Sequence, residues 1–260
     1  MRILLTNDDG VYAPGIAALR KGLMQMGEVH WIAPATEQSG VGHSITFLEP
    51  LVCKQIFDGD ELLAIAVEGS PADCVKLGVS ELIDGEVDVV VSGINGGLNA
   101  GINVLYSGTV AAAIEGAFFR LTSFAVSLEY DPHADFDTAT QIAIPLIRKI
   151  LANKDSAPQL YNINIPTAAV ELYSSGGIPQ VEVVPMGVER YGENYIRRQD
   201  PKGRDYYWAT NDPPPRRTDH ATDLTALADG HVTVTPLKFD MTSIDALQPM
   251  LDWKLTIDPA

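Results

Sequence analysis

The stretch Met1-Arg-Ile-Leu-Leu-Thr-Asn-Asp-Asp-Gly10 decides the expected fold, because a short apolar run ends there in two adjacent carboxylates. Residues 2–6 show no alternation of polar and apolar side chains, which is typical of a strand buried on both faces of a parallel sheet. Ligands of such sheets bind beyond the carboxyl ends of the strands, where Asp8 and Asp9 would lie. Two adjacent anions repel each other, and a bound metal ion would compensate both charges. Residues 7–10 also have the composition of an ordinary turn, so the rest of the chain must distinguish a metal site from a turn.

Strands and helices are expected to alternate along the chain. The spacing of apolar residues predicts a helix from Pro14 to about Gly27 and another over residues 134–152, in which Pro145 should cause a kink or a break. Strands are expected at residues 2–6, 29–33, 87–92, 124–128, 160–165 and 232–237, with an antiparallel hairpin formed by residues 51–57 and 62–67. This order is typical of an α/β protein with mostly parallel strands and helices on both faces.

One domain is expected over residues 1–260, because no internal repeat or linker divides the chain. Its core should comprise about residues 1–166 and 232–251. Scattered aromatic and charged residues, with three consecutive prolines, indicate an extended arm over about residues 180–222. Ile244, Leu247 and Leu251 predict a terminal helix whose apolar face needs a partner.

The chain is strongly acidic. It carries 34 Asp and Glu against 18 Lys and Arg, a net charge of -16, and no large basic cluster. Binding to a DNA or RNA backbone is therefore not expected. An anionic substrate would require local positive potential from backbone amides, a few basic side chains or a bound cation.

Neither a membrane protein nor a disulfide-stabilised protein is expected. No stretch approaches the roughly 18 apolar residues of a membrane span, and Asp8 follows the start too closely for a leader, which favours the cytoplasm. Cys53 and Cys74 lack C-x-x-C spacing and are interpreted as buried small apolar residues rather than as a disulfide or zinc ligands.

Two later loops follow predicted strands and should reach the same edge of the sheet as Asp8. Residues 34–46 form a loop rich in Gly and hydroxyl groups that contains Ser39. Residues 93–109 contain five Gly and three Asn and end in Ser107-Gly108-Thr109, just before a helix of small residues. The backbone N–H groups at such a helix start favour an anion.

Together the three loops predict a metal site for phosphate chemistry. Asp8, Asp9, Ser39 and Asn95 offer only oxygen ligands, which suit one hard divalent cation such as Mg²⁺ or Mn²⁺. With Asp8 and Asp9 as catalytic residues, the predicted reaction is metal-assisted hydrolysis of a phosphate monoester. The phosphate group would contact residues from the third loop, namely Asn95, Gly96, Asn99, Ser107, Gly108 and Thr109.

Other phosphate and hydrolase motifs are absent. The sequence contains neither Gly-x-x-x-x-Gly-Lys-Ser/Thr nor Gly-x-Ser-x-Gly, and Asn-Asp-Asp-Gly replaces a Gly-x-Gly-x-x-Gly after the first strand. These absences disfavour a P-loop NTPase, a serine hydrolase and a dinucleotide enzyme. His43 is interpreted as a structural residue.

The sequence resembles the SurE survival-protein nucleotidases over nearly its whole length. The matching blocks occur in the family's order and include Asn7-Asp-Asp-Gly, Gln38-Ser-Gly-Val-Gly, Gly69-Ser-Pro-Ala-Asp-Cys, Val91-Ser-Gly-Ile-Asn-Gly-Gly-Leu-Asn and Tyr106-Ser-Gly-Thr-Val-Ala-Ala-Ala. The resemblance implies a Rossmann-like core and a divalent cation held by Asp8, Asp9, Ser39 and Asn95. It also implies a cytoplasmic enzyme that hydrolyses nucleoside 5'-monophosphates, with 3'-monophosphates as further candidates. The carboxy-terminal arm would join subunits into a homodimer or homotetramer.

Two alternatives remain open. A nucleotide or phosphate sensor would use the same cradle without turnover, because a binding site alone does not establish catalysis. The second alternative is an enzyme that acts at this site on polyphosphate or short oligonucleotides.

Overall fold

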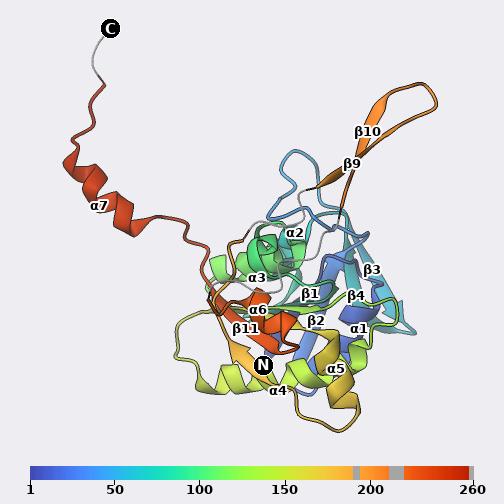
Figure 1. The fold of residues 1–260 in the computed structure, drawn as a ribbon. Helices are drawn as coiled ribbons and strands as arrows, with labels where there is room; N and C mark the ends of the chain where they lie inside the picture. Colours follow the sequence, from blue (N-terminus) through green and yellow to red (C-terminus); the bar gives the residue numbers. More distant parts are fainter. Residues whose placement is uncertain (190–193, 211–219, 258–260) are drawn as a thin grey trace.

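The apolar run at the start of the chain forms β1 (Arg2–Thr6), in which residues 3–6 are buried. In the computed structural model, which describes residues 1–189, 194–210 and 220–257, β1 lies inside a nine-stranded sheet. The strand order is β3-β4-β2-β1-β5-β6-β7-β11-β8 (Figure 1). β1 pairs in parallel with both neighbours, so Ile3 lies beside Val29 on one side and Val89 on the other.

The strands from β4 to β7 in this order are parallel, and β3 and β11 are antiparallel to their neighbours β4 and β7. The chain builds β2 and β4 on one side of β1 and then crosses to β5, β6 and β7 on the other. The carboxyl ends of β1 and β5 therefore meet at a topological switch point, where α/β sheets bind ligands. The other sheet strands are β2 (Glu28–Pro34), β3 (Cys53–Asp58), β4 (Glu61–Val67), β5 (Val89–Gly96), β6 (Thr122–Leu128), β7 (Leu160–Ile165), β8 (Val181–Val183) and β11 (Val232–Leu237).

Helices cover both faces of the sheet, and alternate residues of β1 point to different faces. Ile3 and Leu5 pack in one apolar cluster with α1 (Pro14–Leu23) and α4 (Phe136–Asn153). Leu4 packs in a second cluster with α2 (Pro71–Leu77) and α3 (Gly108–Phe118). The prediction of an α/β fold with helices on both faces is therefore confirmed. The remaining helices are η1 (Gly78–Leu82), η2 (Gly101–Leu105), α5 (Thr167–Ser174), α6 (Asp223–Ala228) and α7 (Ile244–Asp252).

Gly15 allows α1 to approach β5 closely, because a Cβ atom at this position would lie 2.0 Å from the carbonyl oxygen of Ile94. Gly15→Ala is expected to lower the free energy of unfolding by about 3 kcal/mol through overpacking, measured by urea unfolding. Gly176→Ala is the matched control. Gly176 has φ +87°, and a Cβ atom added there would meet nothing within 4 Å, so only backbone strain of about 1 kcal/mol is expected. An equal loss in the two variants would contradict the packing argument.

Two expectations about the chain differ from the structure. Of the kink or break predicted at Pro145, the break does not occur, because α4 runs through Pro145 as one helix. Packing of Ile142, Ile144 and Ile147 in the core offsets the hydrogen bond lost at the proline. The expected arm also begins later than residue 180, because β8 pairs with β11 as an edge strand of the main sheet.

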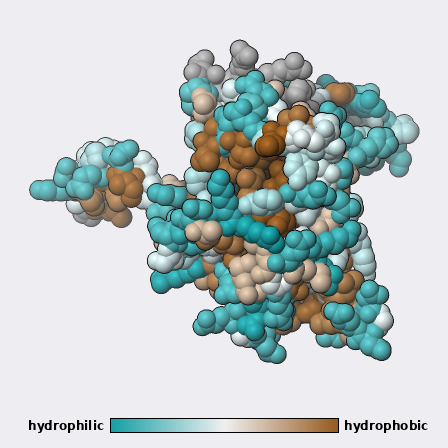
Figure 2. Space-filling view, turned by 90° about the horizontal axis from the view of Figure 1, so that it is seen from below, coloured by the Kyte–Doolittle hydropathy of each residue, from teal (hydrophilic) through white to brown (hydrophobic). Residues whose placement is uncertain are grey.

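Two elements project from the body of the molecule (Figure 1). One is the two-stranded hairpin of β9 (Tyr195–Gln199) and β10 (Asp205–Ala209), which lies within the expected arm. The other is α7, in which none of the residues is buried. Figure 2 shows apolar surface on α7 separated from the body. Residues 190–193 and 211–219 of the expected arm lie outside the described residues.

Candidate functional site

Asp8 follows β1 directly and lies against the start of α3. The hydroxyl of Thr109 donates to Asp8 Oδ1, and the backbone N–H of Thr109 donates to Asp8 Oδ2 at 3.0 Å. A Cβ atom on Gly108 would lie 2.8 Å from Asp8 Cβ, so only glycine leaves room for this contact. The structure thus brings Asp8 together with two residues of the predicted phosphate cradle, and Thr109 directs both donors at Asp8.

Asp9 joins the first loop to the third. Its Oδ2 accepts a hydrogen bond of 3.1 Å from the backbone N–H of Gly96, at the end of β5. Asn95, the residue before, donates from Nδ2 to the carbonyl oxygen of Gly97 at 2.6 Å. This bond uses the amide nitrogen, and Oδ1 remains as the potential metal ligand.

The surroundings of Asp8 and Asp9 disfavour the ionised form of both carboxyl groups. Burial, with a smaller contribution from the charge of Asp9, raises the pKa of Asp8 from 3.8 to about 6, although the hydrogen bonds from Thr109 oppose the shift. Burial also raises the pKa of Asp9, and the nearby charge of Glu37 adds to this effect. Within the described part of the chain, no ion pair joins either carboxylate to a basic side chain. A bound cation would supply the missing compensation.

The second loop reaches the same edge of the sheet. The backbone N–H of Gln38 donates to the carbonyl oxygen of Asp8 at 2.7 Å. The next residue, Ser39, donates its hydroxyl to Glu37 Oε1 at 2.7 Å. Sequence reasoning missed Glu37, whose carboxylate accepts from Ser39 and whose charge acts on Asp9. The only sequence feature that could have indicated a role for Glu37 at the site is its position in the polar loop, one residue before Gln38.

Hydrogen bonds from buried polar side chains hold the third loop, residues 93–109, in place. The backbone N–H of Asn99 donates to Asn164 Oδ1 at 2.8 Å. The side-chain Nδ2 of Asn99 donates to Ser127 Oγ at 2.8 Å. Asp223 was also missed from the sequence; its Oδ2 accepts from the backbone N–H of Gly101 at 2.8 Å, and burial raises its pKa. Asn99 therefore supports the loop, and its predicted phosphate contact stays a prediction.

Ser107 begins α3 as its N-cap. Its Oγ accepts a hydrogen bond of 3.1 Å from the backbone N–H of Val110. The hydroxyl proton of Ser107 is not used in this bond and remains available for an anion. The helix therefore begins where the sequence predicted, and a phosphate contact at this position stays a prediction.

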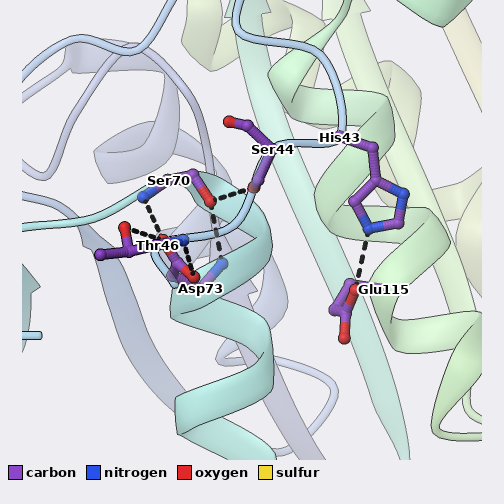
Figure 3. A network of polar contacts seen from close by, with 6 residues as sticks. All are labelled: His43, Ser44, Thr46, Ser70, Asp73 and Glu115. Atoms are coloured by element: carbon purple, nitrogen blue, oxygen red, sulfur yellow. Dashed lines mark hydrogen bonds and ion pairs between the residues drawn. The ribbon is translucent and has the colours of Figure 1, made fainter. Parts of the chain in front are cut away.

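The loop that carries Ser39 is fixed by a polar network farther along the chain (Figure 3). His43 Nε2 lies 2.8 Å from Oε2 of Glu115, a buried residue of α3. Thr46 donates from its backbone N–H and its hydroxyl to Asp73, at 3.0 and 2.7 Å. Ser70 donates its hydroxyl to the carbonyl oxygen of Ser44 at 2.7 Å. These contacts tie the loop to α2 and α3 and agree with the interpretation of His43 as structural.

Asp73 closes this network, because it also accepts from the backbone N–H of Ser70 in a capping box. Asp73→Ala is expected to lower the free energy of unfolding by about 2 kcal/mol, since a helix cap and the loop anchor are lost together. Urea unfolding measures the change, with the exposed Asp84→Ala as the control. A loss in Asp73→Ala no greater than in Asp84→Ala would show that the network does not stabilise the fold.

An open cleft with a volume of about 1020 Å³ adjoins Asp9. Its lining comes from residues 9–14, 35–37 and 130–134, with Gly96 and Phe136. No pattern in the sequence indicated the third segment, which follows β6 and is far from Asp9 along the chain.

Other expectations can be compared with the described residues. Among them, no helix is long and apolar enough to cross a membrane, and no three His, Cys, Asp or Glu side chains group closely enough to hold a metal. The predicted site does not require such a group, because it combines two carboxylates with a hydroxyl and an amide oxygen. Cys53 and Cys74 are both free thiols. Cys74 is buried as predicted, but Cys53 is exposed because it lies on the edge strand β3, so the prediction of a buried side chain is wrong for Cys53.

Known proteins resemble this chain in sequence and in fold. The profile of the family described as "Survival protein SurE" matches residues 3–193. The chain is 59% identical over 256 residues to a 5'-nucleotidase SurE of Rhodopirellula baltica, covering 98% of this chain and 99% of the relative. It is 43% identical to a 5'-nucleotidase SurE of Syntrophobacter fumaroxidans, covering 98% and 100%. The crystal structure of the SurE protein from Aquifex aeolicus matches with a TM-score of 0.83 and 34% identity, covering 98% of this chain and 100% of that one. The chain belongs to the SurE family.

Proposed function

We propose that this chain is a divalent-metal-dependent 5'-nucleotidase that hydrolyses nucleoside 5'-monophosphates to nucleoside and phosphate. The observation that carries the proposal is the position of Asp8, a buried carboxylate held by Thr109 at the start of α3 and adjacent to Asp9. The names of the relatives support the same activity. Nucleoside 3'-monophosphates are further candidate substrates.

The donor set suits a hard divalent cation. Asp8 and Asp9 are neighbouring anions that burial makes costly to ionise, and Ser39 and Asn95 supply neutral oxygens from adjoining loops. These four residues would hold one Mg²⁺ or Mn²⁺ per subunit. When bound, the cation would polarise a phosphoryl oxygen and lower the pKa of water.

The protein side chains position the reacting groups. Thr109 and Gly96 fix the orientations of Asp8 and Asp9. The hydroxyl proton of Ser107, which its bond with Val110 does not use, and the backbone at Gly108 would contact the phosphate oxygens. Water then attacks phosphorus, the bond from phosphorus to the ester oxygen breaks, and the nucleoside leaves as an alcohol with one proton. The two carboxylates at the site are the groups that can take the proton from water.

A phosphate-release assay with AMP, GMP, CMP, UMP and 3'-AMP in Mg²⁺ or Mn²⁺ tests the proposal. Release from the 5'-monophosphates is expected with at least one metal. Tight nucleotide binding without phosphate release across these metals would favour the sensor instead. Faster release from polyphosphate or a short oligonucleotide than from every monophosphate would favour the other alternative.

We also propose that the subunit acts as a homodimer or homotetramer in the cytoplasm. Helix α7 exposes Ile244, Leu247, Met250 and Leu251, and the β9–β10 hairpin projects from the body. A second copy of the chain would cover this apolar surface. Light scattering coupled to gel filtration tests the assembly, and a monomer at all concentrations would contradict it.

A further inference from the structure

The cleft beside Asp9 exposes two aromatic side chains in its lining. Tyr12 follows the first loop and is 74% exposed, and Tyr130 follows β6 and is 73% exposed. Neither hydroxyl nor ring is needed for the apolar core. Aromatic rings exposed in a concave surface commonly contact a ligand with an apolar face.

The cleft adjoins the proposed metal site through Asp9 and Gly96, which both line it. A Cβ atom placed on Gly96 would have Phe136 Cζ at 3.8 Å and Asp9 Oδ2 at 4.0 Å. The ring of Phe136 also lies against Gly15 of α1, where its Cε1 would be 3.1 Å from an added Cβ atom. The aromatic part of the cleft therefore begins next to the carboxylate that would ligate the metal.

Local hydrogen bonds hold both segments that carry the tyrosines. The backbone N–H of His133 donates to Asp131 Oδ1 at 2.6 Å, forming a tight turn directly after Tyr130. On the other side, Asn7 Nδ2 donates to the carbonyl oxygen of Gly10 at 2.9 Å, and the backbone N–H of Val11 donates to the carbonyl oxygen of Pro34 at 2.8 Å. A lining shaped in advance reduces the entropy lost on binding.

The charge of the lining determines which part of a substrate can enter. Asp9, Glu37 and Asp131 contribute carboxylates, and the lining contains no Lys or Arg among the described residues. A phosphate group in the aromatic part of the cleft would meet these carboxylates without a Lys or Arg to compensate their charge. An uncharged sugar and base would not be repelled by these carboxylates.

We propose that this cleft binds the nucleoside of the substrate, with its neutral heteroaromatic base against the rings of Tyr12 and Tyr130 and its sugar passing Gly96. The inference rests on the proposed nucleotidase activity and assigns the part of the substrate that the phosphate cradle does not bind. Tyr12 and Tyr130 are thereby specificity-determining residues, and they are distant from the reacting phosphorus.

The test compares AMP with ribose 5-phosphate, which lacks the base. Tyr12→Ala and Tyr130→Ala are each expected to lower kcat/KM for AMP about tenfold, mainly by raising KM, because base stacking contributes to binding. With ribose 5-phosphate the same variants should stay within about twofold of the unmodified chain. Tyr12→Phe and Tyr130→Phe keep the rings and should keep most of the AMP activity. Tyr173→Ala, on α5 outside the cleft lining, is the control.

Equal losses with the two substrates, or no loss with AMP in the Tyr12→Ala/Tyr130→Ala double variant, would overturn the assignment. Binding of adenosine, measured by calorimetry, separates this inference from the activity. If no nucleotide releases phosphate, the proposed function fails. Saturable adenosine binding that the double variant weakens about tenfold or more would still support the nucleoside site. Equal adenosine binding by both proteins, or binding by neither, would refute it.

Discussion

Asp8→Asn is expected to reduce the rate of phosphate release from AMP by about a thousandfold, because it removes one of two carboxylates that would hold the metal. The substitution is nearly isosteric, and the side-chain oxygen can still accept a hydrogen bond from Thr109. The loss should therefore arise from charge and not from unfolding. Steady-state kinetics at saturating AMP and over a range of Mg²⁺ and Mn²⁺ concentrations measure the effect.

The same variant should be more stable than the unmodified chain in the presence of a chelator at pH 8. Burial raises the pKa of Asp8 to about 6 in the folded protein, so ionised Asp8 destabilises the fold by about 3 kcal/mol above that pH. This destabilisation declines as the pH falls and disappears below the unfolded value of about 3.9. Thermal melts at pH 8 and pH 4 check the sign, with Asp84→Asn as the control. Unchanged turnover in Asp8→Asn would refute the role of this residue.

Removal of divalent cations is expected to abolish activity to a similar extent, about a thousandfold, and added Mg²⁺ or Mn²⁺ should restore it. Without a cation the two carboxylates are uncompensated, and the acidic surroundings disfavour an approaching phosphate. Phosphate release is measured after chelation and after re-addition of each metal, with the metal content checked by elemental analysis.

A second measurement of the metal does not depend on turnover. A cation at about 100 times its dissociation constant should raise the free energy of unfolding by about 2.7 kcal/mol. Asp8→Asn and Asp9→Asn should lose most of this stabilisation, whereas Asp84→Asn should keep it. Full activity in protein verified to be free of metal would eliminate the cation from the proposal.

The centre of the fold could be predicted from the sequence because its signals are local. The unbroken apolar run of β1 requires burial on both faces, and helices with apolar faces supply it. The start of α2 has the same local character, since the N-cap hydroxyl of Ser70 and the proline at position 71 act within one turn. The meeting of the first and third loops followed from the rule that parallel strands end at one edge.

Contacts that depend on tertiary packing could not be predicted in this way. Nothing near Glu37 in the sequence indicates that its carboxylate approaches Asp9, and nothing near Tyr130 indicates a cleft shared with Tyr12. The continuity of α4 through Pro145 likewise depends on apolar residues of other elements. Short elements such as β8 were missed because pairing with β11, rather than their own composition, holds them in place.

The acidic lining of the cleft also has a consequence for the rates of encounter and release. A nucleoside monophosphate carries a charge of about -1.5 to -2 at pH 7, so it is repelled during its approach to a chain with net charge -16. Dissolved salt screens such repulsion beyond about 8 to 10 Å, so the association rate should increase with ionic strength when the metal is saturating. The same repulsion would accelerate the departure of the phosphate dianion. The negative potential of the chain would thus slow the binding of the substrate and also shorten the time for which the product stays bound.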